Sequence, residues 1–512
     1  MKKEEIKSFR KFLNLHEEGS DGNKLKSVIL LEAILDETDH SLLDEKVLCE
    51  KLYGDAGDKS HRTFQKLLLR FKDKLYETLL LDLNLFRKDS YDELTIALSE
   101  VRKFLLLVNI LRFRTSDEEM ERLFDRIITK SKQYELYDEL IQALELKLSF
   151  LGYRIGYDEV SYIRKDIEFF ERCRRSLRTA KEWYTKLGKD ESVTPENTSY
   201  LRYLQHGVEE LEHEYRYTQS LNIAYYLYLV SLEYCQKTGD YEKGRSVSLQ
   251  LIELLETNQS VYLDQRMGTA YLNYANNEIY LLNFSEGLKF ADKAIALFPE
   301  NGINYNLCLD TKAYCHFYSG ELGEAEEILQ GILQDPASKQ TSLQKAKRNY
   351  MLANINFLRK NYAQTNKLLQ ELNELEKDQV DWNNGVRILN LMIQLEQEKY
   401  DLVDSRLENF RKYQERVSKS EDVKKRDRII LKVLLDLSRN AFDFSTVWVK
   451  DEEQFRMLFS EKPESGWQPN GPEMVVFHQW FIKMIRGEYD ANCLNHERSY
   501  PMKMVTSAVY NS

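Results

Sequence analysis

Apolar residues recur three and four positions apart along almost the whole chain, the spacing that places them on one face of an α-helix. Near the N-terminus this pattern predicts four amphipathic helices, with Phe9, Leu31, Leu48 and Phe64 among their apolar residues. No stretch shows the sustained alternation of apolar and polar residues that would indicate a strand. Only 7 Pro and 20 Gly occur among the 512 residues, so few positions would interrupt a helix. The pattern therefore predicts an all-α protein.

A short polar turn followed by an aromatic or apolar residue recurs about every 40 residues, a spacing typical of helical repeat proteins. The anchor residues of these turns are Tyr241, Phe284, Leu322, Tyr362 and Tyr400, and a similar turn occupies residues 156–160. A small residue three positions after an anchor would let two helices approach closely, as at Gly244, Gly287 and Ala325. One such hairpin cannot bury its apolar face alone, so we expect the hairpins to stack into an α-solenoid.

Residues 268–301 resemble one unit of the tetratricopeptide repeat family. The matching small, aromatic and proline positions are Ala275, Phe284, Gly287, Ala294 and Pro299, whereas Glu278 replaces an aromatic residue. The resemblance is clearest over residues 225–415 and implies a tetratricopeptide-like helical-hairpin solenoid. We therefore predict a helical N-terminal domain over residues 1–90, the solenoid over residues 91–425, and a helical C-terminal cap and tail over residues 426–512.

The resemblance also implies which residues line the concave groove, where members of the family bind a peptide or a helix. These residues are Asn276, Tyr280, Asp310, Tyr314, Lys347, Tyr350 and Asn354. Asn side chains with a nearby Lys resemble a clamp for a C-terminal carboxylate, an anion that such donors suit, although Asp310 would oppose it. Two alternatives stay open: a mixed polar groove without a clamp, and a groove filled by the chain's own helices.

Charge and targeting signals narrow the class of protein. With 73 Lys and Arg against 84 Asp and Glu, the formal net charge is −11, which disfavours nucleic-acid binding by the molecule as a whole. The six cysteines are scattered without a paired motif, so we expect reduced, buried thiols. The N-terminal residues lack the apolar stretch of a signal peptide, and the apolar run at 104–111 is far shorter than the roughly 20 residues that span a bilayer. We expect a soluble, cytoplasmic protein.

The sequence contains no motif for phosphate binding, acyl transfer, zinc proteolysis or protein phosphorylation. His206, Glu210 and His213 would share one helix face and suit zinc, but a solvated polar face is the stronger interpretation. The neighbouring Cys315 and His316 would point about 100° apart on a helix, which favours core packing over a nucleophile pair. We predict no catalytic residue, no metal site and no cofactor, and therefore no enzyme activity.

Residues 58–75 predict a helix with one basic face in a part of the chain that is otherwise nearly neutral. The basic residues are Arg62, Lys66, Arg70 and Lys74. Together with residues 41–55, this helix makes a helix-turn-helix-like pair. The block resembles the N-terminal domain of bacterial transcriptional activators that join a winged helix to a tetratricopeptide-like domain, but residues 76–94 offer no β-hairpin wing. Residues 1–150 also resemble a group of uncharacterised bacterial tetratricopeptide-like proteins, which implies no activity.

These patterns favour a non-enzymatic adaptor or scaffold that binds a protein or peptide on the concave face of the superhelix. The alternative is a transcriptional regulator that binds DNA through residues 58–75 and a partner through the solenoid. An acidic protein is a further candidate partner for the basic face. No membrane partner is expected, and the identity of the protein or peptide does not follow from the sequence.

Overall fold

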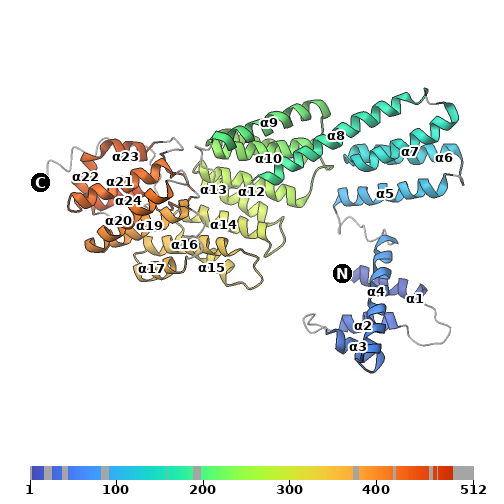
Figure 1. Cartoon of the computed structure of the whole chain (residues 1–512), viewed down its shortest axis with the longest axis horizontal. Helices are drawn as coiled ribbons and strands as arrows, with labels where there is room; N and C mark the ends of the chain where they lie inside the picture. Colours follow the sequence, from blue (N-terminus) through green and yellow to red (C-terminus); the bar gives the residue numbers. More distant parts are fainter. Residues whose placement is uncertain are drawn as a thin grey trace. The chain divides into compact units, whose positions relative to one another are not determined.

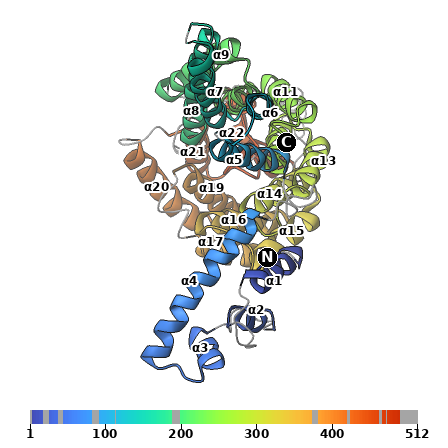
Figure 2. The same cartoon turned by 90° about the vertical axis from the view of Figure 1, so that its right-hand side faces the viewer.

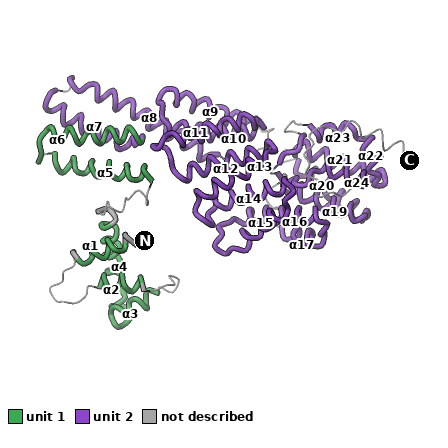
Figure 3. The backbone as a smooth tube through the Cα atoms, turned by 180° about the vertical axis from the view of Figure 1, so that it is seen from behind, with its two compact units in different colours: residues 1–134 green, residues 135–512 purple. Residues whose placement is uncertain are grey.

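A computed structural model of the chain describes residues 3–16, 26–36, 44–81, 92–112, 114–156, 158–187, 198–372, 380–418, 423–460, 465–469 and 471–487. Every regular element in these ranges is an α-helix, so the predicted all-α class is confirmed. The chain forms two compact units, Met1–Tyr134 and Glu135–Ser512 (Figure 3). This division does not coincide with the boundaries expected near residues 90 and 425, and the three-part domain organisation stays a prediction.

The described helices of the first unit are α1 (Lys3–His16), α2 (Lys26–Asp36), α3 (Glu45–Tyr53), α4 (Asp58–Leu81), α5 (Glu93–Leu111) and α6 (Asp117–Gln133). Cys49 of α3 and Phe64 of α4 are fully buried together with Leu30 of α2. The rings of Phe9 in α1 and Phe71 in α4 meet edge to face with centroids 5.1 Å apart. Figure 2 shows α3 beside one end of the long helix α4. The apolar faces predicted for the N-terminal helices therefore pack around α4.

The second unit is built from helical hairpins. Its described helices are α7 (Tyr137–Ile155), α8 (Ser161–Lys186), α9 (Thr198–Thr218), α10 (Leu221–Thr238), α11 (Tyr241–Thr257), α12 (Asp264–Tyr280), α13 (Phe284–Ile295), α14 (Ile303–Tyr318), α15 (Leu322–Gln334), α16 (Ser342–Leu358), α17 (Tyr362–Gln370), α19 (Val380–Glu396), α20 (Tyr400–Val417), α21 (Lys425–Arg439), α22 (Phe444–Lys450), α23 (Glu452–Leu458) and α24 (Phe477–Arg486). Each helix from α9 to α17 contacts the next, and α12 also contacts α14, the first helix of the following hairpin (Figure 1). This arrangement confirms the tetratricopeptide-like solenoid.

Each predicted turn anchor is the first residue of the second helix of a hairpin. Two positions before each anchor the backbone is left-handed, with φ between 54° and 82°. These left-handed residues are Gly239, Leu282, Gly320, Lys360 and Glu398. The amide that follows each of them donates a hydrogen bond of 2.8–3.0 Å to the carbonyl five residues back. This is the Schellman C-cap, which satisfies a carbonyl that the end of a helix would leave unpaired.

Three further turns with a left-handed residue two positions before a helix escaped the sequence analysis. They precede α7, α10 and α22, with positive φ at Glu135, Gln219 and Phe442. A left-handed backbone costs an L-residue about 1–2 kcal/mol, so glycine is its usual sequence signal. Glycine is absent from these three turns, as it is from the left-handed positions Leu282, Lys360 and Glu398 of the turns that were found. Within the earlier turn expected at 156–160, Gly156 has a φ of 100° and position 157 lies outside the described residues.

The small residues after the anchors permit close helix contact, as predicted. A Cβ atom on Gly287 would lie 3.1 Å from the Cys315 Sγ and 3.3 Å from the Ala275 carbonyl oxygen. A Cβ atom on Gly244 would lie 2.4 Å from the Asn277 Oδ1. A larger side chain at Gly287 would press on the backbone of α12, and one at Gly244 would displace the Asn277 side chain.

Glu278, which stands where the repeat pattern has an aromatic residue, forms an ion pair with an arginine. The Glu278 side chain is fully buried, and its two carboxylate oxygens accept hydrogen bonds of 2.6 and 2.8 Å from the Arg245 guanidinium. A buried carboxylate is tolerated when a bidentate cation of this kind compensates its charge. Here an ion pair between hairpins replaces the aromatic contact that the family prefers.

The last helices share the core of the solenoid. Phe455 of α23 and Phe477 and Phe481 of α24 are fully buried in the same apolar cluster as Phe357 of α16 and Phe410 of α20. The aromatic helix expected at 474–485 begins at Phe477, after three buried residues in extended conformation or bends. Within the described part of the chain, no helix combines the length and apolarity needed to cross a membrane.

Candidate functional site

Asp310, one of the predicted groove residues on α14, forms an ion pair within the protein. Both carboxylate oxygens of Asp310 accept hydrogen bonds, of 2.7 and 2.8 Å, from the buried guanidinium of Arg348 on α16. Arg348 also donates to the Gln340 Oε1 at 2.8 Å. Burial raises the pKa of Asp310 above its ordinary value, while the Arg348 charge acts in the opposite direction. Asp310 thus joins two hairpins, and its charge is compensated within the protein.

Of the three predicted residues on α16, Tyr350 and Asn354 are buried and Lys347 is half-buried. Tyr350 and Asn354 are each about 1 % exposed, and the Asn354 Nδ2 donates to the Tyr350 carbonyl at 2.9 Å. The Lys347 ammonium lies 4.9 Å from the centre of the Trp382 ring. The Tyr350 hydroxyl donates to the Pro472 carbonyl at 2.7 Å. The Asn354 amide of the predicted carboxylate clamp therefore donates within the chain, and the Lys347 ammonium lies over the Trp382 ring.

Residues 465–476, which we call the inner segment, cover this part of the groove. Its described residues form turns and bends rather than a helix, so the covering element differs from the helices considered in the sequence analysis. The Trp467 ring meets Tyr318 of α14 edge to face with centroids 5.5 Å apart. At Gly385 of α19 an added Cβ atom would lie 2.5 Å from the Pro472 carbonyl oxygen. The absence of a side chain at Gly385 lets the inner segment approach α19 closely.

Arg426 of α21 anchors the inner segment at its centre. Its guanidinium pairs in bidentate fashion with the Glu473 carboxylate, at 2.5 and 2.7 Å, and both side chains are about nine-tenths buried. It also donates to the carbonyls of Leu458 and Ser465 at 2.9 Å and contacts the His478 Nδ1 at 3.1 Å. Burial, with the Arg426 charge as a second cause, lowers the pKa of His478 well below its ordinary value of 6.5. His478 is therefore an uncharged acceptor beside a compensated cation.

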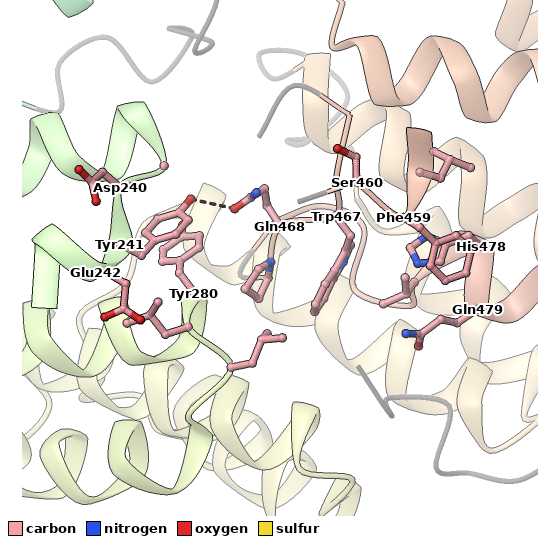
Figure 4. Close-up of a pocket in the computed structure, with 16 residues that line it drawn as sticks. Asp240, Tyr241, Glu242, Tyr280, Phe459, Ser460, Trp467, Gln468, His478 and Gln479 are labelled. Carbon is pink, nitrogen blue, oxygen red and sulfur yellow. Dashed lines mark hydrogen bonds between the residues drawn. The ribbon is translucent and has the colours of Figure 1, made fainter. Parts of the chain in front are cut away.

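A cavity of about 300 Å³ remains beside the inner segment (Figure 4). Tyr241 and Tyr280 stack on one side of it, with ring centroids 4.5 Å apart and planes within 3°. The Tyr241 hydroxyl donates to the Gln468 Oε1 at 2.8 Å. The Trp467 indole, whose Nε1 donates to the Glu473 carbonyl at 2.8 Å, lines the other side. The cavity is thus bounded by aromatic rings that hydrogen bonds or stacking hold in place.

Of the predicted groove residues, Tyr280 lines this cavity. Asn276 and Tyr314 are half-buried nearby on α12 and α14, where the Asn276 Oδ1 accepts from the Thr311 hydroxyl at 3.0 Å. Trp467 and Gln468 were missed as site residues. A Gly- and Pro-rich loop with a tryptophan was visible in the sequence, but its place against α10 and α12 was not.

The predicted basic face lies on the surface of α4. Arg62, Lys66 and Arg70 are exposed, and Lys74 is half-buried, with its pKa lowered by burial. Helix α4 continues to Leu81, through the first part of the stretch in which a wing would have to stand. Residues 82–91 lie outside the described residues.

The residues considered for zinc binding or for a nucleophile pair do not come together in a site. His206 and His213 are exposed, and the nearest atoms of His206 and Glu210 are 3.9 Å apart. Glu210 accepts a hydrogen bond of 2.9 Å from the Trp183 Nε1. Cys315 is buried in the core, where burial raises the pKa of its thiol to about 12. A group of three side chains suited to a metal ion does not occur among the described residues.

Comparison with known proteins adds little beyond the fold. No protein-family model matches the chain, and no curated protein matches it. One solved structure similar to it is a Signal Transduction ATPase with Numerous Domains (STAND) protein with a tetratricopeptide repeat sensor from Pyrococcus horikoshii. The match has 11% sequence identity and a TM-score of 0.35, and it covers 88% of this chain and 65% of that protein. A likeness this distant carries no argument about function.

Proposed function

We propose that this chain is a non-enzymatic adaptor or scaffold that binds a protein or peptide on the face formed by the first helices of its hairpins. The observation that carries this proposal is the cavity beside Tyr241, Tyr280 and Trp467. Aromatic rings with nearby polar groups are the usual anchors of protein interfaces. A volume of about 300 Å³ is at the lower end of the range for ligand pockets, so it suits one or two side chains of a partner.

The proposed partner docks across the hairpin ends and inserts a side chain into the cavity. The inner segment contacts α14 and α16 through Tyr318 and Tyr350, so the accessible part proposed here is formed by the turns after α10 and α12, which line the cavity. Tetratricopeptide-like folds commonly mediate protein interactions, and a rigid array of hairpins holds such a face in one conformation.

The test compares captured proteins between matched variants of the full chain. Tyr280→Ser removes one ring of the stacked pair that lines the cavity. Tyr400→Ser removes a ring from an equivalent stacked pair, Tyr400 and Phe442, whose centroids are 4.3 Å apart and which lies outside the cavity. We expect Tyr280→Ser to lose specific partners that the wild type and Tyr400→Ser retain. Purified partners must then bind the wild type directly. An identical set for all three proteins would contradict the assignment of the cavity.

The exposed arginines and lysine of α4 support the second proposal, that the chain regulates transcription by binding DNA through residues 58–75. Phosphate contacts by such residues give an affinity that falls steeply with salt. We expect duplex DNA to be retarded at low salt by the wild type and released by the triple variant Arg62→Glu, Lys66→Glu and Arg70→Glu. Unretarded DNA with the wild-type protein at low salt would end this proposal.

A further inference from the structure

The charged residues described at the edge of the cavity are acidic. Asp240 and Glu242 are exposed at its edge, and the described residues that line it include no lysine or arginine. The Glu242 carboxylate also accepts a hydrogen bond of 3.1 Å from Arg245, whose guanidinium is shared with the buried Glu278. The imidazole of His478 in its wall is uncharged near neutral pH, because burial and the Arg426 charge lower its pKa. The groups that face the cavity therefore attract a cation and offer nothing that would neutralise an anion.

The aromatic walls suit the same ligand. Tyr241 and Tyr280 approach from one side of the cavity, and Trp467 from the other (Figure 4). The face of an aromatic ring carries partial negative charge and attracts an ammonium or a guanidinium within about 6 Å, with tryptophan the strongest partner. A planar guanidinium can also stack on such rings.

A third observation concerns hydrogen bonding at the inner end of the site. Gln479 lines the cavity, and its Oε1 is buried without a hydrogen-bond partner in the protein. Buried carbonyl oxygens are nearly always satisfied. The Oε1 has almost no exposed surface in this conformation, so it becomes available to a donor in the cavity once the Gln479 side chain turns toward the cavity. An ammonium or guanidinium supplies only donors, whereas a carboxylate or phosphate would supply none.

We propose that the cavity binds the side chain of a basic residue, arginine or lysine, from a partner peptide. The carboxylates of Asp240 and Glu242 draw the cation to the edge, the rings hold its charged end, and the Gln479 carbonyl accepts one of its hydrogen bonds. This inference rests on the proposed function and names the chemistry of its partner.

The test uses the full chain and isothermal titration with three probes. The first is a short Gly/Ser peptide with a central arginine, and the second carries citrulline, which has nearly the same shape without the charge. The third is agmatine, a free guanidinium compound. We expect the arginine peptide to bind at least about fivefold more tightly than the citrulline peptide, the ratio that one favourable charge contact would give.

Matched variants test whether a preference for the arginine peptide over the citrulline peptide arises at this cavity. Asp240 caps α11 by accepting a hydrogen bond of 3.2 Å from the Lys243 amide, and asparagine caps a helix equally well. The double variant Asp240→Asn, Glu242→Gln therefore removes the charge while α11 stays capped, and we expect it to reduce the arginine preference to near unity. Asp401→Asn, at an exposed position one residue after another turn anchor, should leave the preference intact.

Four outcomes would overturn the inference. Equal affinity for the arginine and citrulline peptides would exclude recognition of the charge. A preference that survives the double variant would place the cation elsewhere on the protein. Binding of agmatine without binding of the arginine peptide would make the ligand a free organic cation rather than a peptide side chain. Partner capture that depends on Tyr280 but not on charge would preserve the proposed function while refuting this inference.

Discussion

Replacing Arg426 by methionine is the most direct test of how the inner segment is held. Methionine fills much of the space of the arginine stem but provides no donor. It would leave the Glu473 carboxylate, only about 11% exposed, with the Phe477 amide as its partner at 2.8 Å. It would also remove the donors to the carbonyls of Leu458 and Ser465.

The expected loss is large because the remaining charge is buried. Removing one partner of a buried ion pair typically lowers the free energy of unfolding by about 3–5 kcal/mol. Replacing both partners by apolar residues avoids the uncompensated charge. We therefore expect Arg426→Met to lose about 3–5 kcal/mol, and the double variant Arg426→Met, Glu473→Leu to recover a substantial part of that loss.

Urea unfolding followed by far-UV circular dichroism measures both variants against the wild type. Arg216→Met is the control, because Arg216 of α9 pairs with Glu212 while their side chains are 74% and 51% exposed. Exposed pairs contribute about 0–1 kcal/mol, so this control should change little. A loss below about 1 kcal/mol for Arg426→Met, equal to that of the control, would refute a buried, stabilising anchor.

Three further predictions concern the same region. Gly385→Ala should lower the free energy of unfolding by about 1–3 kcal/mol, because its new methyl group would collide with the Pro472 carbonyl. Urea unfolding measures this change, and an unchanged unfolding midpoint would contradict the prediction. Tyr350→Phe should cost about 0.5–1.5 kcal/mol in the same assay, since it removes the hydroxyl that donates to Pro472. His478 remains uncharged in the folded protein, so below pH 6.5 only the unfolded chain takes up its proton. Stability should therefore fall with decreasing pH by up to about 1.4 kcal/mol per unit from this group. His478→Gln should flatten the slope between pH 6.5 and 5, and equal slopes for both proteins would show that His478 is protonated in the fold.

The turns illustrate what could be read from the sequence. Tyr241, Phe284 and the other anchors were identified because each combines a polar turn, an apolar residue and flanking helical periodicity within a few positions. The turns at Glu135 and Gln219 also have a left-handed residue but no glycine, and the turn at Gln219 has no aromatic anchor, so they were not found. The helices themselves were predictable because one apolar face repeated every three or four residues is enough to define them.

The site was less predictable because its parts are distant in the sequence. Tyr280 was identified from its repeat position, whereas Tyr350 and Asn354, chosen by the same reasoning, are covered by the inner segment. The hydrogen bond between Tyr241 and Gln468 joins residues 227 positions apart. No local pattern encodes such a contact.

The amino-acid pattern alone determined the all-α class, the hairpin repeat and the close helix contacts at Gly244 and Gly287. These features depend on interactions within a hairpin or between adjacent hairpins, so nearby residues specify them. Which groove residues are buried, and which line a cavity, depended on where the inner segment lies in the folded chain. That position is set by the buried pair of Arg426 and Glu473 and by the space at Gly385, contacts that exist only once the hairpins and the last helices have packed together.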